Sequence, residues 1–431
     1  MFYYNAKYAF ALPGQAPTAI AGGIISAAAM PAGQLLRRSF RKFPYLQHRL
    51  FDPQVYLSTL DSHVAASTVV NLASWPWFCP GAAPEYDSDT HTSLKNWKDT
   101  YGGTLLQSWP GCAHTDSQTI SDACVAAIRV QLELGCEMVI LPGPLTNLAT
   151  HHFVSETEWI DAGIEACKAL KVSQPALATV AISDSVLRGV DPTENPLLHT
   201  ISNQVSARPE LAGVYLLPEM ASENGYVCTS RDTLLSMLLL IDDFVRGAGK
   251  RVVMNYVGTF GAVASAAGAS VWSSGYYRGQ RRLRLADFED QIGRAMPRYH
   301  SPKLAGDIGL EHDIQEAYKQ YGDRLLIDTK DGATLTRALE SGTYPPAEWE
   351  YAQSNVTAAS GHYVEVAYRL GRLATQSPDK RIETVQRWLE GAVHWVGNLQ
   401  KIGITGSAQT ELTHQVVWLD AVTNWRNQAG L

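Results

Sequence analysis

RVVMNYVGTFGAVASAAGASVWSSGYYRGQRRLR, residues Arg251 to Arg284, is the stretch that decides the fold. Residues 251–257 have the apolar, β-branched composition of a buried strand, and 269–273 form a second run of this kind. Between them, a glycine-containing turn at 258–261 leads into a short helix of small residues. Two strands joined by so short a helical crossover are expected to be parallel neighbours, so both carboxyl ends open on one face.

An arginine-rich run follows the second of these strands and contains Arg278, Arg281, Arg282 and Arg284. The whole chain has a net charge of -7, so this run is basic against an acidic background. In a (β/α)8 barrel, anions most often bind at the loops after the seventh and eighth strands. The stretch therefore predicts the last two strands of such a barrel, with a local site for phosphate.

Composition limits the function classes. The chain has 431 residues, of which 45% are hydrophobic, which is enough for a large core. Its acidic balance excludes a generic polyanion binder, so any contact with nucleic acid must come from a local basic site. The six cysteines show no metal-ligand spacing and indicate reduced thiols in a cytoplasmic protein. No motif indicates a metal or a cofactor, and no apolar run is long enough to cross a membrane.

Predicted strands and helices alternate along the first two thirds of the chain. The predicted strands are 3–12, 46–51, 104–107, 137–141, 176–182, 214–217, 251–257 and 269–273. Helices are predicted at 19–29, after the first strand, and at 117–134, among others. Eight strands without a GxGxxG turn favour an α/β fold of the (β/α)8 TIM-barrel type over residues 1–298, rather than a doubly wound sheet.

Beyond residue 298 the pattern becomes helical. The predicted helices are 310–321, 334–340, 346–373, 380–400 and 410–425. Apolar residues and tryptophans recur on them at spacings of three and four, which is typical of helix faces that pack into a core. We expect residues 299–431 to form an all-helical C-terminal domain that packs on the barrel or binds a protein partner.

Three carboxylates directly follow predicted strands: Asp52, Asp184 and Glu219. At a barrel mouth, one carboxylate can attack or stabilise an anomeric carbon while another moves a proton. We expect Glu219 to be the nucleophile, Asp184 the acid/base, and Asp52 a second acid/base or a sugar contact. The alternative is turn or capping chemistry, since Asp52 precedes a proline and Asp184 opens a loop.

Polar and glycine residues at the same strand ends are predicted to bind the substrate. Arg278 can make a bidentate contact with phosphate, and backbone amides in the glycine turn can supply further donors. The predicted substrate-binding residues are Asn147, Asn255, Tyr256, Gly258, Gly261, Tyr277 and Arg278. For the arginines, the alternative is a solvated charged face.

Two short segments resemble known families. GPLTN at 143–147 resembles a segment of nucleoside hydrolases, although the acidic DxDxGxDD calcium motif of that family is missing. The segment 251–279 is similar in layout to the last two strands of tRNA-guanine transglycosylases, barrels that exchange a base at an N-glycosidic bond. Their zinc-binding cysteines are missing, and Ser273 and Ser274 occupy the position of their aspartate nucleophile. This resemblance implies glycosidic chemistry with a different carboxylate, Glu219 or Asp184.

The sequence thus predicts a glycosidic-bond enzyme, a hydrolase or base-exchanging transferase, that acts on a phosphate-bearing nucleotide or nucleic-acid-like substrate. A second interpretation is a catalytically inactive barrel that serves as a binding or scaffold subunit of a larger assembly. A third is a flavin enzyme that uses the same phosphate site, which would give a yellow preparation.

Overall fold

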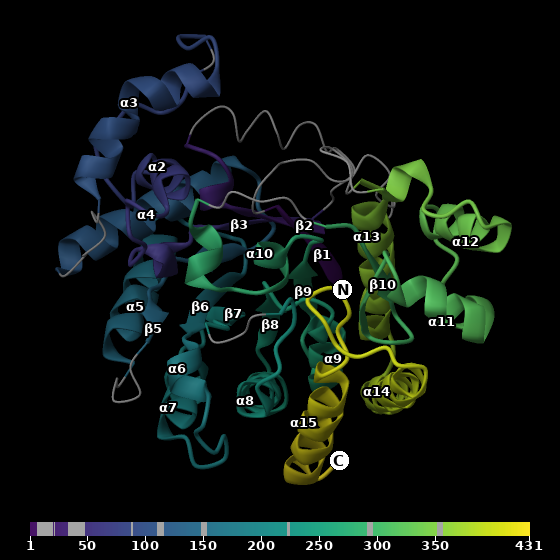
Figure 1. The fold of residues 1–431 in the computed structure, drawn as a ribbon. Coiled ribbons are helices and arrows are strands. Elements are labelled where there is room, and N and C mark those ends of the chain that lie inside the picture. The colour runs from purple at the N-terminus through teal and green to yellow at the C-terminus, as the bar shows by residue number, and fades with distance from the viewer. Residues whose placement is uncertain are drawn as a thin grey trace.

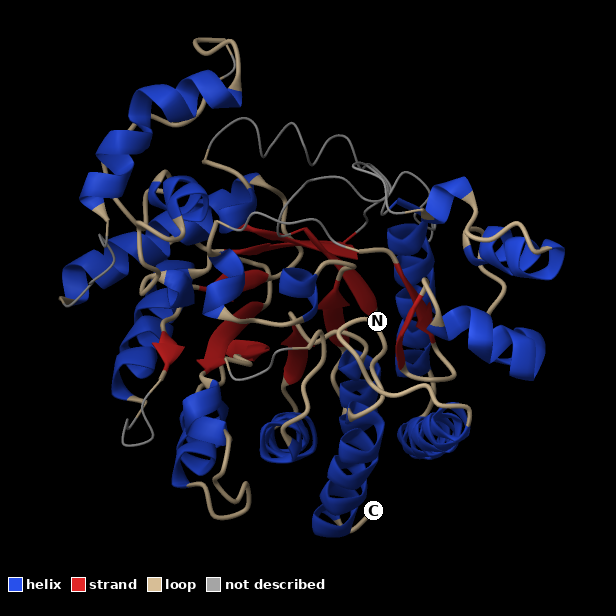
Figure 2. Ribbon diagram, in the orientation of Figure 1, coloured by secondary structure: helices blue, strands red, loops and turns tan. Residues whose placement is uncertain are grey.

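Parallel strands form the centre of the molecule, with helices around them (Figures 1 and 2). The computed structural model describes residues 1–6, 20, 22–32, 48–87, 89–109, 116–147, 153–221, 225–290, 296–350 and 357–431. The strands are β1 (Phe2–Ala6), β2 (Gly22–Ser26), β3 (His48–Asp52), β4 (Val139–Leu141), β6 (Ala176–Ile182), β7 (Leu211–Pro218), β8 (Arg251–Met254) and β9 (Val271–Ser274). Their order is β3-β2-β1-β9-β8-β7-β6-β4, and the short β5 (Leu145–Thr146) pairs with the end of β6.

The two edge strands of this sheet approach one another, so the barrel is nearly closed. The backbone N–H of Glu137, just before β4, donates to the carbonyl of Arg49 in β3 at 3.1 Å. The Glu137 side chain also accepts a hydrogen bond from Tyr3 of β1 at 2.5 Å and pairs with His48 of β3. The predicted fold class, a (β/α)8-type barrel followed by C-terminal helices, is confirmed.

The strands are buried on both faces, as parallel barrel strands require. Every residue of β6 is buried. Strands β7 and β8 lie so close together at Gly213 that only a glycine fits there. A Cβ on Gly213 would lie 2.1 Å from the carbonyl oxygen of Arg251 in β8. The helices that follow the later strands are α4 (Ser117–Glu133), α5 (Val154–Ala169), α6 (Asp184–Leu187), α7 (Pro196–Ser206), α8 (Arg231–Asp242) and α9 (Phe260–Ala267). Helices α5, α7, α8 and α9 lie outside the strands in Figure 1.

Two of the predicted elements in the first third of the chain were wrong. The expected strand at 104–107 lies inside α3 (Leu94–Ser108), whose N-terminus is capped by the Ser93 hydroxyl. The expected helix at 19–29 contains β2 and a 3₁₀ turn, η1 (Ala27–Ala29). A short, fully buried run of small apolar residues has no periodicity that distinguishes a strand from a helix. The two errors cancel, which is why the predicted number of barrel strands still agrees.

The C-terminal region packs on the barrel beside β1 and β9. Its helices are α11 (Asp313–Tyr321), α12 (Gly332–Ser341), α13 (Thr357–Gly371), α14 (Pro378–Lys401) and α15 (His414–Ala429). Helix α13 contacts β1 and α9, α14 contacts α9, and α15 contacts α8. Helices are therefore present in four of the five predicted ranges, whereas the range 346–373 contains a 3₁₀ turn at 347–349 and α13, with residues 351–356 outside the described residues. A division of the chain at residue 298 stays a prediction. Among the described residues, no helix is long and apolar enough to cross a bilayer.

The sequence did not predict an antiparallel hairpin, β10 (Arg298–Ser301) and β11 (Gly306–Gly309), that precedes these helices. Its strands are short and carry charged residues, so their sequence has no alternating apolar pattern. The remaining short elements are η2 (Val55–Leu57), α2 (Ala66–Ala73), η3 (Asp243–Gly247), α10 (Arg278–Arg281), η4 (Leu285–Phe288), η5 (Gly322–Leu325), η6 (Ala347–Trp349) and η7 (Arg372–Thr375).

Candidate functional site

A chain of buried hydrogen bonds joins four strands of the barrel. Asn5 of β1 donates to the Asn255 side-chain oxygen at 2.7 Å, and Asn255, just after β8, donates to the Tyr215 hydroxyl at 2.6 Å. Tyr215 of β7 in turn donates to Asp52, the last residue of β3, at 2.8 Å. None of these four side chains is more than 1% exposed. The barrel interior therefore has a connected polar layer, which we call the central network.

Asp52 is held inside the central network by three donors. Its carboxylate accepts hydrogen bonds from the Tyr56 hydroxyl at 2.6 Å, from Tyr215, and from the Gln54 backbone N–H at 3.1 Å. Burial raises the pKa of Asp52 to about 6, although the hydrogen bonds from Tyr56, Tyr215 and Gln54 oppose that rise. Asp52 is buried and already accepts three hydrogen bonds from within the protein, so the geometry favours the turn and network role.

Two residues beside Asp52 and Asn255 adopt left-handed backbone conformations. Gln54 has φ 57° and Tyr256 has φ 59°, and neither is a glycine. The Gln54 side chain donates to the Tyr256 hydroxyl at 2.9 Å, and Ser26 at the end of β2 lies 3.0 Å from the same hydroxyl. Such conformations cost roughly 1–3 kcal/mol each and concentrate at ligand sites and active sites. Their pairing here makes the ends of β2, β3 and β8 part of the candidate site.

Glu219 is a buried carboxyl group directly after β7. Its carboxylate accepts a hydrogen bond from the Ser183 hydroxyl at 2.5 Å. Burial raises its pKa above the ordinary value, and the Ser183 hydrogen bond opposes this while the nearby charge of Asp184 adds to it. The residue is held by the backbone as well, since its N–H donates to Ile182 of β6 at 2.8 Å. Glu219 therefore retains a proton more readily than an exposed glutamate.

Asp184 lies beside Glu219 and opens α6, for which Ser183 is the N-cap. Both of its carboxylate oxygens lie 3.2 Å from Arg188 Nε, one turn further along the helix. Asn147 belongs to the same part of the rim, because its carbonyl accepts a hydrogen bond from Ser185 at 3.1 Å. The structure thus brings together two of the three predicted carboxylates, whereas the third, Asp52, belongs to the central network.

The arginine run divides into buried and partly exposed residues. Arg281 and Arg282 are buried in salt bridges with Asp307 at 2.7 Å and Asp287 at 2.9 Å. Arg278 is half-buried, with its guanidinium 4.9 Å from the centre of the Tyr226 ring. Within the described part of the chain, neither Arg278 nor the half-buried Arg284 has a carboxylate partner, and Arg278 is the one that contacts Tyr226.

The two predicted phosphate-binding glycines have different environments. Gly258 has φ 55° and a Cβ there would lie 3.5 Å from the carbonyl oxygen of Arg281, so it borders the arginine run. At Gly261 a Cβ would lie 2.3 Å from the Trp272 ring, and the amide donates to the Gly258 carbonyl at 3.4 Å. Close packing of α9 on β9 therefore explains Gly261. Tyr277 is half-buried beside the Tyr276 ring, just before α10.

Sequence reasoning missed a second charged group, which the hairpin contributes. Asp307 of β11 contacts Arg281, Arg298 and His300, at 2.7, 3.2 and 2.7 Å. Burial alone would raise the pKa of Asp307, but the two guanidinium groups hold it well below its ordinary value. No motif links Arg281 to Asp307, so only the fold brings them together. Among the described residues, no group of three or more His, Cys, Asp or Glu side chains is arranged to hold a metal ion.

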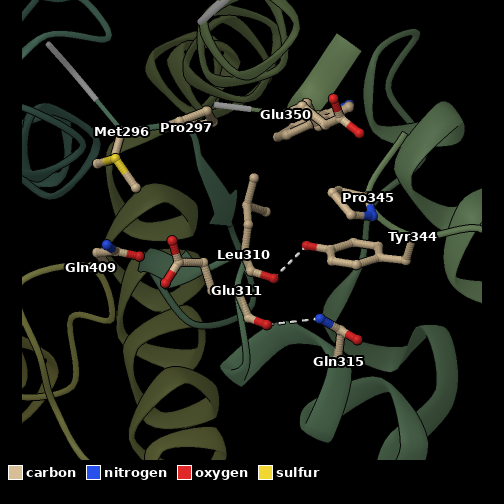
Figure 3. Close-up of a pocket in the computed structure, with 10 residues that line it drawn as sticks. Met296, Pro297, Leu310, Glu311, Gln315, Tyr344, Pro345, Glu350 and Gln409 are labelled. Carbon is tan, nitrogen blue, oxygen red and sulfur yellow. Dashed lines mark hydrogen bonds between the residues drawn. The ribbon is translucent and has the colours of Figure 1, made fainter. Parts of the chain in front are cut away.

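A cavity of about 310 Å³ lies outside the barrel mouth, beside β11 and η6 (Figure 3). Its polar lining residues are Glu311, Gln315, Glu350 and Gln409, without a basic residue among the described lining. Tyr344 borders it and donates to the Leu310 carbonyl at 2.6 Å. None of the predicted site residues lines this cavity, and its acidic lining is unsuited to a phosphate-bearing ligand.

Comparisons of the chain with family models, with curated proteins and with solved structures found no match. A barrel fold is compatible with many activities, so the function has to be argued from the residues at the strand ends.

Proposed function

We propose that the protein is a glycosidic-bond enzyme that hydrolyses or exchanges a base on a phosphate-bearing nucleotide or nucleic-acid-like substrate. The observation that carries the proposal is the pair Glu219 and Asp184, two buried carboxyl groups in different environments at the ends of neighbouring strands. One faces a serine hydroxyl and the other faces an arginine. Paired carboxyls in contrasting environments are typical of acid/base assignments in glycosidases.

The environments of Glu219 and Asp184 favour the reverse of the roles predicted from sequence, with Glu219 as the acid/base and Asp184 as the nucleophile or stabilising carboxylate. Glu219, with its raised pKa, suits the proton donor that protonates the departing base as the bond to the anomeric carbon breaks. Asp184 then supplies the carboxylate that stabilises or attacks the anomeric carbon. Water or an incoming base completes the reaction, and Glu219 recovers its proton from that group.

Arg278 supports the phosphate-bearing nature of the substrate. The segment that carries it runs beside the Glu219 segment, since Met220 N–H donates to the Leu283 carbonyl at 2.7 Å. Tyr226, from the same loop as Glu219, lies against the Arg278 guanidinium. The Arg278 guanidinium, which has no carboxylate partner among the described residues, would bind the phosphate while the sugar lies over Glu219 and Asp184.

The decisive experiment replaces Glu219 by glutamine and measures release or exchange of bases from nucleotides and from RNA. Glu219→Gln keeps an oxygen that accepts from Ser183, so the fold should be retained while turnover falls by about 10²–10⁴-fold. Glu210→Gln is the matched control, because Glu210 is exposed and pairs with Lys168 at 3.3 Å on the surface. Equal turnover in wild type and Glu219→Gln would remove the carboxyl pair from the mechanism.

The scaffold alternative is favoured by one specific observation, namely that Asp52 and Asp184 already have partners inside the protein. Under that interpretation the wild-type protein has no turnover, and Asp184→Asn would only lower its stability. Detectable base release that is lost in Asp184→Asn, with an unchanged unfolding midpoint, would contradict it.

A further inference from the structure

Two arginines lie buried between the loop after β9 and the hairpin. Arg281 and Arg298 are each 2% exposed. Arg281 donates through Nη1 to Asp307 at 2.7 Å, while Arg298 Nε lies 3.2 Å from the same carboxylate without the alignment of a hydrogen bond. The Nε and Nη2 atoms of both arginines are buried and have no hydrogen-bond partner in the described structure.

In both arginines, the atoms without a hydrogen-bond partner are the same two, Nε and Nη2. Nε and Nη2 form the edge of a guanidinium that donates two parallel hydrogen bonds to a carboxylate or phosphate. Buried N–H groups are nearly always hydrogen-bonded, so these four donor atoms, of which only Arg298 Nε lies near a carboxylate, indicate a bound acceptor. The two guanidinium carbons lie 5.5 and 3.4 Å from the Tyr226 ring centre, and 5.5 and 5.6 Å from that of Tyr276. Both arginines therefore border the same pair of rings.

The positive charge of the two arginines is only partly balanced by neighbouring carboxylates. Asp307 balances one of the two cations, and Glu411, which accepts from the Asp307 N–H at 3.2 Å, is the other carboxyl group of the cluster. Burial and the charge of Asp307 raise the pKa of Glu411 to about 7. Burial lowers the pKa of His300, which favours its neutral form. With Glu411 protonated, the cluster carries an excess positive charge.

Tyr226 contacts both this cluster and Arg278. Its half-buried ring lies 3.4 Å from the guanidinium carbon of Arg298, and its centre is 4.9 Å from that of Arg278. Arg278 is half-buried and is the outer arginine of the group, whereas Arg298 is fully buried and is the inner one. The Tyr226 ring is thus shared by the three cations Arg278, Arg281 and Arg298.

We propose that Arg281 and Arg298 form an internal oxyanion site, bordered by Tyr226, which binds the phosphate or carboxylate group of a small ligand. This site does not depend on the proposed glycosidic chemistry, because neither Glu219 nor Asp184 contributes to it. It is also distinct from the outer contact at Arg278, which the proposed function assigns to the substrate.

The test measures thermal unfolding and calorimetric binding of the full chain with inorganic phosphate, with acetate, and with chloride at matched ionic strength. Phosphate, acetate or both should raise the unfolding temperature above the chloride value, and the arm that responds identifies the phosphate or carboxylate class. Arg298→Lys, which keeps the charge but loses the two-donor edge, should weaken this binding roughly tenfold or more. Arg246→Lys is the matched control, because Arg246 pairs with Asp242 on the surface.

Two outcomes would overturn the site. Equal unfolding temperatures in phosphate, acetate and chloride would mean that water alone satisfies the buried donors. A response lost in Arg278→Met and kept in Arg298→Lys would place the anion at the outer contact. The wild-type measurements need no variant, so a poorly folded Arg298 variant does not prevent the test, and Arg281→Lys repeats it from the second arginine.

A pH series with sulfate gives a second readout, since sulfate keeps its charge between pH 6 and 8. Glu411 faces Asp307, Arg281 and Arg298, with His300 and His414 nearby. Sulfate affinity should fall several-fold above about pH 7, as Glu411 loses its proton and repels the anion. Glu411→Gln should bind sulfate with no such fall, and a fall of equal size in that variant would contradict the assignment.

Discussion

Tyr215→Phe is the sharpest test of the central network, because it deletes one oxygen and leaves the ring in place. The Tyr215 hydroxyl donates to the buried Asp52 carboxylate at 2.8 Å and accepts from Asn255 at 2.6 Å. Hydrogen bonds to charged groups contribute about 1.5–3 kcal/mol, and a buried donor left unpaired, as at Asn255, costs about 1–3 kcal/mol. After the smaller desolvation of phenylalanine is allowed for, the expected loss is about 3 kcal/mol in the free energy of unfolding.

The assay is urea unfolding at pH 7.5, followed by tryptophan fluorescence. Tyr344→Phe is the matched control, since its hydroxyl makes one hydrogen bond, to Leu310 at 2.6 Å, at a partly exposed position. That variant should lose about 1 kcal/mol. A loss in Tyr215→Phe no greater than in Tyr344→Phe would refute the claim that the network couples the strands.

Two further predictions concern the barrel. The pKa of Asp52 is raised from 3.8 to about 6, so the folded state binds this proton more tightly than the unfolded state. The free energy of unfolding should therefore fall as the pH rises from about 4 to about 6, and Asp52 should contribute no pH dependence below that range. The pKa difference corresponds to about 3 kcal/mol. In urea titrations, the free energy of unfolding of Asp52→Asn relative to that of the wild type should rise by up to this amount between pH 4 and pH 7. A difference between the two proteins that does not change with pH would contradict the raised pKa. Gly213→Ala places a Cβ 2.1 Å from a backbone oxygen and should unfold or destabilise the protein by about 3 kcal/mol or more, whereas Gly391→Ala, in open space on α14, should be neutral or slightly stabilising in thermal unfolding.

The later part of the barrel could be predicted from sequence because its strands are long apolar runs separated by glycine, proline and clear amphipathic helices. Strand β6 and helix α4 agree with the predicted ranges within about two residues at either end. The first part of the barrel could not be predicted in this way, because the segment AIAGGIISAAAM at 19–30 is as compatible with a buried helix as with a strand. Tertiary pairing decides for a strand, because β2 lies between β1 and β3 in the sheet, and the close approach of the Tyr3 ring, 2.4 Å from a Cβ on Gly22, requires the glycine.

The candidate site was predictable only where its chemistry directly follows a strand. Glu219, Asp184 and Asn255 were found by this rule, and each lies at a strand end. The rule does not reach partners such as Tyr215, which points inward from the middle of β7, or Ser183, whose hydroxyl binds Glu219. Local sequence also gave no reason to expect left-handed conformations at residues other than glycine, which tertiary contacts stabilise.

The arginine cluster bears on how the two parts of the chain function together. Arg281 follows the last barrel strand, while Asp307 and Glu411, its nearest carboxyl groups, lie beyond residue 298. A buried arginine without its carboxylate partner is strongly destabilising, so the loop after β9 depends on the hairpin for its stability. That loop also carries Arg278, the proposed outer anion contact. The hairpin, through Asp307, therefore helps to hold the loop after β9 in place beside the barrel.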